Sequence, residues 1–297
     1  MQSRSDHLIF AHFNVRSVCS HFIKFSEFVG AEGYDVIGLS ETWLNAGVVD
    51  SALVIAGYRL VRKDRNGRGG GVAFYIKDSL NFKILPLPPS VSLLEQLWVS
   101  IKIGGIKMCF GSLYRPPNVN LNTSIEDLEN ALVSFLPSFD HVVFGGDLNV
   151  DLSNSNSDGS RTLNRFFTKY SLSQLIVSHT RISPNSKTLL DVILTNSPDL
   201  ATDTQVIEMD DISDHCLVYT ELKILKPRPP ITFRTYRDYS HFNYDNFLND
   251  LFFIDWNVIY YIESVDEIIN FFNHNHKAVS FMLPLKHLVL LRHQRLG

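Results

Sequence analysis

The sequence has few cysteines and no long apolar run, and both shortages exclude classes of protein. Its three cysteines, Cys19, Cys109 and Cys216, are odd in number and far apart, so they fit neither a disulfide framework nor a zinc knuckle. We expect them to be small buried apolar residues. No run of about 18 apolar residues occurs, and the first residues lack the apolar core of a signal peptide. Neither a membrane span nor secretion is indicated, and an intracellular protein is the default.

The sequence also lacks an excess of basic residues. Its net charge is −4, and residues 223–297 hold nine Lys and Arg against seven Asp and Glu, which leaves 18 against 24 in the rest. Attachment to nucleic acid by bulk charge is therefore not indicated. The acidic excess before residue 223 is either a solvated surface or a site for a divalent cation. No internal repeat is visible.

Apolar residues make up 45% of the chain, enough for a large core, and they are arranged as alternating strands and helices. Strand, helix and strand in succession predict two crossover connections onto mixed sheets. Gly104–Gly105 marks a hairpin, and Thr123 to Glu126 form a capping box that predicts the start of a helix. The predicted strands cover residues 7–14, 34–40, 72–77, 97–103, 106–113, 142–149, 189–195 and 216–225, with helices near residues 22–29, 123–136 and 163–167.

The character of the chain changes after residue 225. A proline-rich basic segment opens a predicted linker over residues 226–237. Beyond it we expect helices around residues 242–253 and from a capping box at Ser264, in a tail over residues 238–297 that packs loosely against the rest. His274 and His276 have no cysteine or acidic ligand spaced with them, so a metal site there is not predicted.

One apolar strand ends in Gly145-Gly146-Asp147-Leu148-Asn149. The glycines would let the backbone turn and approach a ligand, and strand alternation would aim Asp147 and Asn149 the same way. The alternative is an Asx turn that caps an ordinary strand.

Other predicted strands also end in polar residues. Asn14 and Glu41 end the first two, and Tyr114 ends the hairpin, either as a core aromatic or as a phenol aimed at a phosphate. Asp191 lies inside an apolar strand and needs a partner, for which His215 is the natural candidate, although a purely structural pair is an alternative.

A basic turn over residues 62–68 leads into Gly69–Gly71. These glycines precede neither Lys-Ser/Thr nor a helix, so a nucleotide P-loop is rejected. The turn is either a solvated hairpin or a contact to a DNA backbone.

Taken in order, these strand ends resemble the endonuclease/exonuclease/phosphatase superfamily over residues 7–225. Within it, the segments at residues 14–17, 40–44, 68–72, 114–117 and 190–196 are similar to the endonuclease domain of LINE-type non-LTR retrotransposons. Residues 233–239 and 281–286 resemble the spacer that precedes a reverse transcriptase in such elements. The Tyr-x-Pro-Asn pattern of the family has an extra proline here, so Asn118 is not carried over and Arg115 is left open.

The resemblance implies a four-layer α/β/β/α sandwich of two mixed sheets over residues 1–225, followed by the linker and a truncated, mainly helical spacer. It also implies a metal-dependent phosphodiesterase that nicks double-stranded DNA and leaves a 3′ hydroxyl. In a full-length element, reverse transcriptase and element RNA would be its partners, in the nucleus. Two alternatives stay open, a catalytically inert DNA-binding remnant and a phosphoesterase of the same fold that acts on a small phosphoester.

The resemblance further implies a role for each polar strand end. Glu41, Asp214 and Asn14 would hold Mg²⁺, for which Mn²⁺ can substitute. Asp147 would orient or deprotonate the attacking water, with Asn149 beside it. The phosphate oxygens would be bound by Tyr114 and by His215, the latter held by Asp191. The full set is Asn14, Glu41, Tyr114, Asp147, Asn149, Asp191, Asp214 and His215.

Overall fold

The structure is a computed structural model of the 297-residue chain. It describes residues 6–65, 69–89, 94–227, 232–237, 243–280 and 285–290. The chain divides into two compact units, residues 1–227 and residues 228–297. Parts of the predicted basic turn (66–68), of the linker and spacer (228–231, 238–242) and of the tail (281–284, 291–297) lie outside the described residues.

The first unit contains two six-stranded mixed sheets. One has the strand order β13-β14-β1-β2-β4-β3. Its strands are β1 (His7–Asn14), β2 (Val36–Ser40), β3 (Tyr58–Lys63), β4 (Val72–Lys77), β13 (Ala201–Ile207) and β14 (Leu217–Leu225). The strands β1 and β2 are parallel, and β14 pairs antiparallel with β1, so the first and last predicted strands of this unit are neighbours.

The other sheet has the strand order β5-β6-β7-β8-β12-β9. Its strands are β5 (Phe82–Ile84), β6 (Glu95–Ile103), β7 (Ile106–Tyr114), β8 (His141–Asp147), β9 (Ser173–Gln174) and β12 (Asp191–Thr195). The strands β7 and β8 are parallel, and β12 runs antiparallel to β8. A separate hairpin consists of β10 (Arg181–Ser183) and β11 (Ser186–Thr188).

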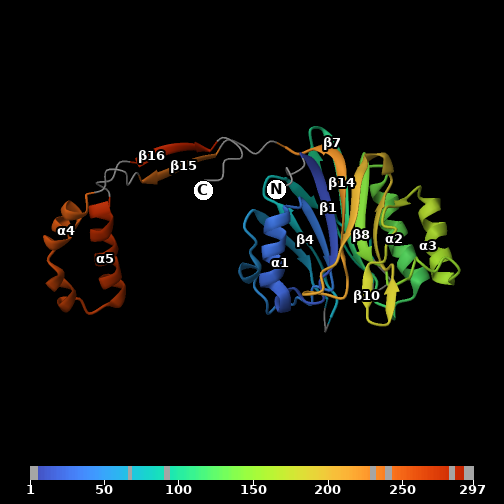
Figure 1. The fold of residues 1–297 in the computed structure, drawn as a ribbon, viewed down its shortest axis with the longest axis horizontal. Coiled ribbons are helices and arrows are strands. Elements are labelled where there is room, and N and C mark those ends of the chain that lie inside the picture. The colour runs from blue at the N-terminus through green and yellow to red at the C-terminus, as the bar shows by residue number, and fades with distance from the viewer. Residues whose placement is uncertain are drawn as a thin grey trace. The chain divides into compact units, whose positions relative to one another are not determined.

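Helices cover the outer face of each sheet, as Figure 1 shows. Helix α1 (Val18–Glu32) connects β1 to β2, and α2 (Leu121–Phe135) connects β7 to β8; α3 (Asp158–Lys169) lies beside α2. The two parallel pairs confirm both predicted crossovers. Short 3-10 helices lie at Asp50–Leu53 and Pro198–Leu200. The predicted four-layer sandwich is confirmed.

Three apolar clusters fill the spaces between these layers. Phe10, Phe74 and Phe110 belong to the cluster between the two sheets. A second cluster joins α2 and α3 to the β6–β7–β8 face around Trp98, and a third joins Phe25 of α1 to the outer face of β1, β2 and β4. Strand alternation therefore sends each strand's residues into two cores, as expected for sheets covered on both faces.

The start of α2 differs from the prediction. The capping box predicts a start at Thr123, but the helix begins at Leu121 because Asn120 is its N-cap. The side-chain oxygen of Asn120 accepts from the backbone N–H groups of Asn122 (2.9 Å) and Thr123 (3.4 Å). The side chains of Thr123 and Ser124 instead donate to the Asn120 carbonyl.

All three cysteines are free, but they do not share one environment. Cys109 and Cys216 are buried as predicted, whereas the prediction is wrong for Cys19, which is exposed. Cys19 follows Val18 in α1, and since Val18 is packed into the core, the helical turn carries its neighbour to the outer side.

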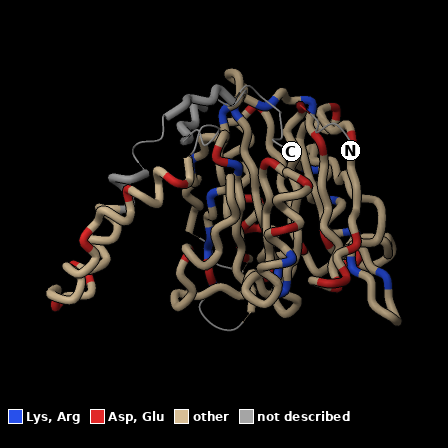
Figure 2. Tube along the Cα trace, turned by 60° about the vertical axis from the view of Figure 1, so that its left-hand side comes forward, with Lys and Arg blue, Asp and Glu red and all other residues tan. Residues whose placement is uncertain are grey.

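Charged residues of both signs are interspersed over the first unit (Figure 2). Among the described residues, no helix combines the length and apolar character that crossing a membrane requires.

The second unit contains the predicted helices and a strand pair that the sequence did not predict. Its elements are β15 (Thr232–Arg237), α4 (Tyr244–Phe252), a 3-10 helix (Trp256–Tyr261), α5 (Val265–Ser280) and β16 (Leu285–Leu290). The strands β15 and β16 pair antiparallel. Trp256 packs against Phe271 and Phe272 of α5, with ring centroids 6.2 and 6.1 Å apart.

Candidate active site

The predicted polar residues meet at one end of the two sheets of the first unit. The carboxyl ends of β1, β2, β7 and β8 carry Asn14, Glu41, Tyr114 and Asp147. Because β12 and β14 run antiparallel to their neighbours, their amino ends lie at the same end of the sandwich. This brings Asp191, at the start of β12, and Asp214 and His215, just before β14, to the other four.

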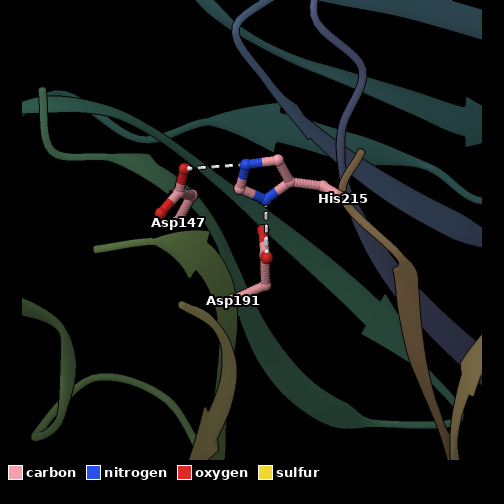
Figure 3. A group of neighbouring side chains, drawn as sticks. All are labelled: Asp147, Asp191 and His215. Atoms are coloured by element: carbon pink, nitrogen blue, oxygen red, sulfur yellow. Dashed lines mark hydrogen bonds and ion pairs between the residues drawn. The ribbon is translucent and has the colours of Figure 1, made fainter. Parts of the chain in front are cut away.

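His215 lies between two carboxylates (Figure 3). Its Nδ1 donates to Asp191 Oδ2 at 2.8 Å, and its Nε2 lies 4.0 Å from Asp147 Oδ2. Asp147 and Asp191 are directly paired across β8 and β12. All three side chains are almost fully buried, so the pairing of Asp191 with His215 suggested by the sequence is present in the structure.

This burial and these charges shift the proton affinities of the group. Burial raises the pKa of Asp147 to about 7, helped by the charge of Asp191 and opposed by His215. Burial acts against a charged His215, but Asp191 outweighs it through its charge and hydrogen bond, and the pKa of His215 rises to about 9. His215 is therefore an imidazolium at neutral pH, positioned next to Asp147.

Asp147 and Asn149 lie side by side, though not through strand alternation. The strand β8 ends at Asp147, and Asn149 has a left-handed φ of 49°. The Asn149 backbone N–H donates to Asp147 Oδ1 at 2.8 Å, the Asx-type bond of the alternative reading, and its side-chain nitrogen is 3.3 Å from Asp147 Oδ2. The turn thus fixes both the Asp147 carboxylate and the carboxamide next to it.

The expectation that Gly145 and Gly146 turn the backbone toward a ligand is wrong. Both lie inside β8. A Cβ atom on Gly145 would lie 2.5 Å from the Cβ of His12, and one on Gly146 would lie 2.6 Å from the Cβ of Leu113. The two glycines are required because β1 of the other sheet approaches β8 at Gly145, and β7 of the same sheet approaches it at Gly146.

Asn14 connects Asp147 to Glu41. Its side-chain nitrogen donates to Asp147 Oδ2 at 2.9 Å and to Glu41 Oε1 at 3.1 Å. Asn14 Oδ1 accepts from the backbone N–H of Arg16. In the structure, Asn14 therefore presents its amide nitrogen to both carboxylates and aligns them.

The loops that carry Glu41 have an unusual backbone. Five of the six non-glycine residues with positive φ in the described part of the chain belong to the site: Arg16, Ser17, Glu41, Trp43 and Asn149. Backbone bonds lock the β1 and β2 ends together, with Ser17 N to Glu41 O at 2.9 Å and Val18 N to Thr42 O at 3.0 Å. Strained conformations of this kind persist only where surrounding contacts hold them, and they are enriched at functional sites.

Gly69–Gly71 support the Glu41 loop from the other side. The backbone N–H of Trp43 donates to Gly70 O at 2.8 Å. Gly71 has a φ of 87°, and a Cβ there would lie 2.4 Å from Thr42 Oγ1, so only glycine fits. Glu95 accepts from the Gly71 N–H and from Arg65, and its pKa is raised by burial and, among other causes, by the nearby Glu41.

Tyr114 is largely buried beside Glu41. Burial raises the pKa of its phenol, and the charge of Glu41 and a side-chain hydrogen bond to Glu41 raise it further. Arg65 belongs to the basic turn and is its last described residue before the glycines. Its guanidinium carbon lies over the Tyr114 ring, 5.7 Å from the ring centroid. Tyr114 is therefore a neutral hydrogen-bond donor next to the carboxylates.

Asp214 is close to the site but is held by arginines. Arg16 Nη1 lies 2.7 Å from Asp214 Oδ1, and Arg181 Nε lies 2.9 Å from Asp214 Oδ2. Burial opposes the charge of Asp214, but the two arginines keep its pKa below the ordinary value. The structure therefore pairs Asp214 with two cations that no sequence pattern connects to it.

Arg115 is a further residue whose part the sequence did not show. It is buried, and its guanidinium donates to the carbonyls of Leu148 (2.6 Å) and Asn149 (2.9 Å). Its own carbonyl accepts from the Asn149 side chain at 2.9 Å. Arg115 thus holds the turn after β8; an arginine directly after a buried strand was the only available signal.

Two kinds of chemistry are available here. Asp147, Asp191 and His215 offer ligand atoms within 4.8 Å of one another, the spacing of a metal site. A metal at these three residues would have to displace the proton of His215, whose pKa is raised to about 9, so they are better suited to transferring a proton and binding negative charge. Among the described residues, no Lys or Arg forms an ion pair with Glu41, whose carboxylate accepts from the neutral N–H groups of Asn14 and Trp43 and from the Tyr114 hydroxyl. Because Glu41 has neutral hydrogen-bond donors and no ion-pair partner among the described residues, it is the better place for a divalent cation.

Comparison with known proteins gave a family and a set of similar folds. The sequence profile of the Endonuclease/Exonuclease/phosphatase family matches residues 11–215. No curated protein sequence matched.

Solved structures resemble the chain in fold. The endonuclease domain of TRAS1, a telomere-specific non-LTR retrotransposon, has a TM-score of 0.60 at 15% identity, over 74% of this chain and 100% of that one. An AP endonuclease from Archaeoglobus fulgidus has a TM-score of 0.54 at 17% identity, over 73% and 100%. The 3′ phosphatase NExo from Neisseria, bound to a product DNA hairpin, has a TM-score of 0.54 at 15% identity, over 72% and 99%.

Proposed function

Because the chain belongs to the endonuclease/exonuclease/phosphatase family, we propose that it is a Mg²⁺-dependent DNA endonuclease that nicks double-stranded DNA and leaves a 3′ hydroxyl. The observation that carries the proposal is the continuous chain of contacts from Asp191 through His215 and Asp147 to Asn14 and Glu41. These contacts support the proposal because they link a cationic histidine to two carboxylates, and the second, Glu41, has no ion-pair partner among the described residues.

Glu41 would be the main ligand of Mg²⁺, and Asp214 would add a second carboxylate. Asn14 would complete an all-oxygen set with its amide turned so that Oδ1, in place of the nitrogen, faces Glu41. The fit to Glu41 is good because its carboxylate is partly exposed and has no cationic partner among the described residues. Asp214 would share its oxygens with Arg16 and Arg181. When bound, the metal would neutralise charge that develops on the phosphate oxygens and on the leaving 3′ oxygen.

The residues of the chain would do the rest. Asp147, aligned by Asn14 and by the Asn149 N–H, would accept a proton from the attacking water. The His215 imidazolium, held by Asp191, would bind a non-bridging phosphate oxygen, and the Tyr114 hydroxyl would donate to another. Attack by water would form the new P–O bond and break the bond to the 3′ oxygen, which would take up a proton from solvent, giving a 5′ phosphate and a 3′ hydroxyl.

A 3′ hydroxyl at a nick is the primer end that a reverse transcriptase needs. We therefore infer a role in non-LTR retrotransposition, with chromosomal DNA in the nucleus as the target. The reverse transcriptase and the element RNA would be the partners. The similarity in fold to the TRAS1 endonuclease domain is consistent with this role.

Relaxation of supercoiled plasmid tests the proposal. We expect the purified chain to produce open circles in Mg²⁺ and not in EDTA, and His215→Ala to abolish this activity. His7→Ala, at the opposite end of β1, is the matched control and should nick normally. Direct extension of the nicks by a DNA polymerase would show a free 3′ hydroxyl.

Failure of a folded protein to nick would contradict the proposal. Retained DNA binding would then favour the inert remnant. Hydrolysis of small phosphoesters would favour the other phosphoesterase activity.

A further inference from the structure

A hollow of about 440 Å³ adjoins the candidate active site on the first unit. Arg16, Trp43 and Asp214 line it, together with His21 at the start of α1 and Asp210 in the loop before β14. It shares Asp214 with the proposed metal set, and Trp43 donates to Glu41. A ligand in this hollow would therefore be next to the Mg²⁺ proposed at Glu41.

Trp43 is fixed in position although its ring is exposed. Its indole Nε1 donates to Glu41 Oε2 at 3.1 Å, and its backbone N–H donates to Gly70 O. The side chain is nevertheless 44% exposed, whereas Trp98 in the same unit is fully buried. Burying an indole is strongly favourable, so a rigidly held, open indole beside the site is a ready surface for stacking a flat apolar ligand.

Arg16 offers a second fixed planar group in the same hollow. Its backbone has a φ of 44°, and its guanidinium is bonded to Asp214 Oδ1 at 2.7 Å. The side chain is still 44% exposed. A guanidinium that is already oriented can stack on a ring or donate to ring acceptors with little further loss of entropy.

The charge of the hollow selects the kind of ligand. Asp210, Asp211 and Asp214 contribute carboxylates, of which Asp214 is paired with Arg16 and Arg181 and Asp211 with Lys24. The arginine of the lining is thus already engaged by a carboxylate and is not free for a phosphate, whereas the carboxylate oxygens could accept from the amino groups of a nucleobase. The volume also lies within the usual range of small-ligand sites, about 300–1,000 Å³.

We propose that this hollow binds an unstacked nucleobase of the nucleotide next to the scissile phosphate, with Trp43 as its stacking surface. The inference rests on the proposed cleavage of DNA. It makes Trp43 and Arg16 determinants of which base stands beside the nick. Base stacking on an aromatic side chain tolerates any base, and the carboxylate oxygens of the lining would favour bases with exocyclic amino groups.

Two substitutions separate stacking from support of Glu41. Trp43→Phe keeps an aromatic face and loses the N–H bond to Glu41, whereas Trp43→Ala loses both. With a duplex oligonucleotide and saturating Mg²⁺, we expect Trp43→Ala to raise KM by roughly 5- to 150-fold, whereas Trp43→Phe should keep a KM close to that of the unchanged protein and lower only kcat, through the lost bond to Glu41. If Phe and Ala lower kcat equally and leave KM unchanged, the indole acts only through Glu41 and the proposal is wrong.

Tryptophan fluorescence tests the site without cleavage. In an Asp147→Asn, Trp256→Phe protein, Trp43 is the one exposed tryptophan, since the chain has three and Trp98 is fully buried. We expect saturable quenching by a duplex with one unpaired nucleotide, and weaker quenching by the fully paired duplex, because the unpaired base has less stacking to lose.

The result can be separated from that of the proposed function. Nicking by the unchanged protein together with unchanged Trp43 emission at saturating DNA would remove the base site and leave the endonuclease. Quenching by the duplex with one unpaired nucleotide, together with no nicking by the unchanged protein, would support the base site and remove the endonuclease.

Discussion

Replacing Asp191 by Asn should move the alkaline limit of activity by more than two pH units. The substitution preserves the shape of a fully buried side chain and removes its charge. Asp191 Oδ2 bonds His215 Nδ1 at 2.8 Å, and Asp191 is the main reason that the pKa of His215 reaches about 9 despite burial. Without that charge, burial should bring the pKa of His215 toward or below its ordinary value of 6.5. The free energy with which His215 binds its proton would thereby weaken by about 3 kcal/mol.

The consequence for catalysis follows from the charge of His215. At pH 8, His215 would change from mostly protonated to mostly neutral, and its interaction with a phosphate oxygen would weaken. Loss of a positioned acid or base typically costs about 10²- to 10⁴-fold in rate. We expect kcat for plasmid nicking to fall within this range at pH 8, and the alkaline limb to move from near pH 9 to near pH 6.5.

Initial nicking rates between about pH 6 and pH 10, at saturating Mg²⁺ and DNA, measure this shift. Asp35→Asn is the matched control. Asp35 is also buried, but it lies just before β2, at the opposite end of that strand from Glu41, and pairs with Lys77 and Lys226. It should lose stability and keep the alkaline limb. An unchanged limb in Asp191→Asn would refute the assignment of His215 as the charged group.

Four further outcomes are expected. Glu41→Gln should lower kcat at least about 100-fold and weaken Mg²⁺ binding measured by calorimetry, with DNA binding retained; normal metal affinity would contradict the ligand assignment. Gly71→Ala should destabilise the protein by about 1–3 kcal/mol in urea titrations and lower activity, because the new Cβ displaces Thr42 and the Glu41 loop. Since burial raises the pKa of Asp147 from 3.8 to about 7, the folded state holds that proton more tightly, and stability falls as pH rises through this window. Asp147→Asn should flatten this fall in Tm measured against pH, and an unchanged slope would show that another group causes it. A chain of residues 1–227 should keep the Tm that the first unit has in the full chain, and the nicking activity, because the three cores and the site use only these residues; an unfolded fragment would contradict this.

The sequence was informative wherever an apolar run ended in a polar residue. Asn14, Glu41 and Asp147 were found in this way, and the parallel crossovers predicted from element order bring them to one end of the sandwich. Asp191 and His215 were paired on the argument that a buried carboxylate needs a partner. These predictions succeeded because each depends on local pattern and on a general cost of burial.

Contacts between distant segments were not predictable in the same way. Arg16 and Arg181 both pair with Asp214, but nothing in the local sequence distinguishes them from surface arginines. Gly145 was assigned to a turn because its requirement comes from His12 on the other sheet, which the sequence cannot place against it.

The same limit applies to side-chain exposure and to helix starts. Cys19 was misplaced because one step around a helix decides its exposure. The start of α2 was misplaced because Asn120 competes with the capping box as N-cap.

The pairing of β1 with β14 has a consequence for the order in which the enzyme is made. Arg16 and Asp214 are 198 residues apart in the chain, and His215 lies still further along. During synthesis the ribosome would complete both helical layers and most of each sheet before His215 emerged. Contacts between such distant residues form late and slowly. A nascent or prematurely terminated chain that ends before β14 would therefore have no assembled site, and under the proposed function unfinished copies would leave the DNA around them uncut.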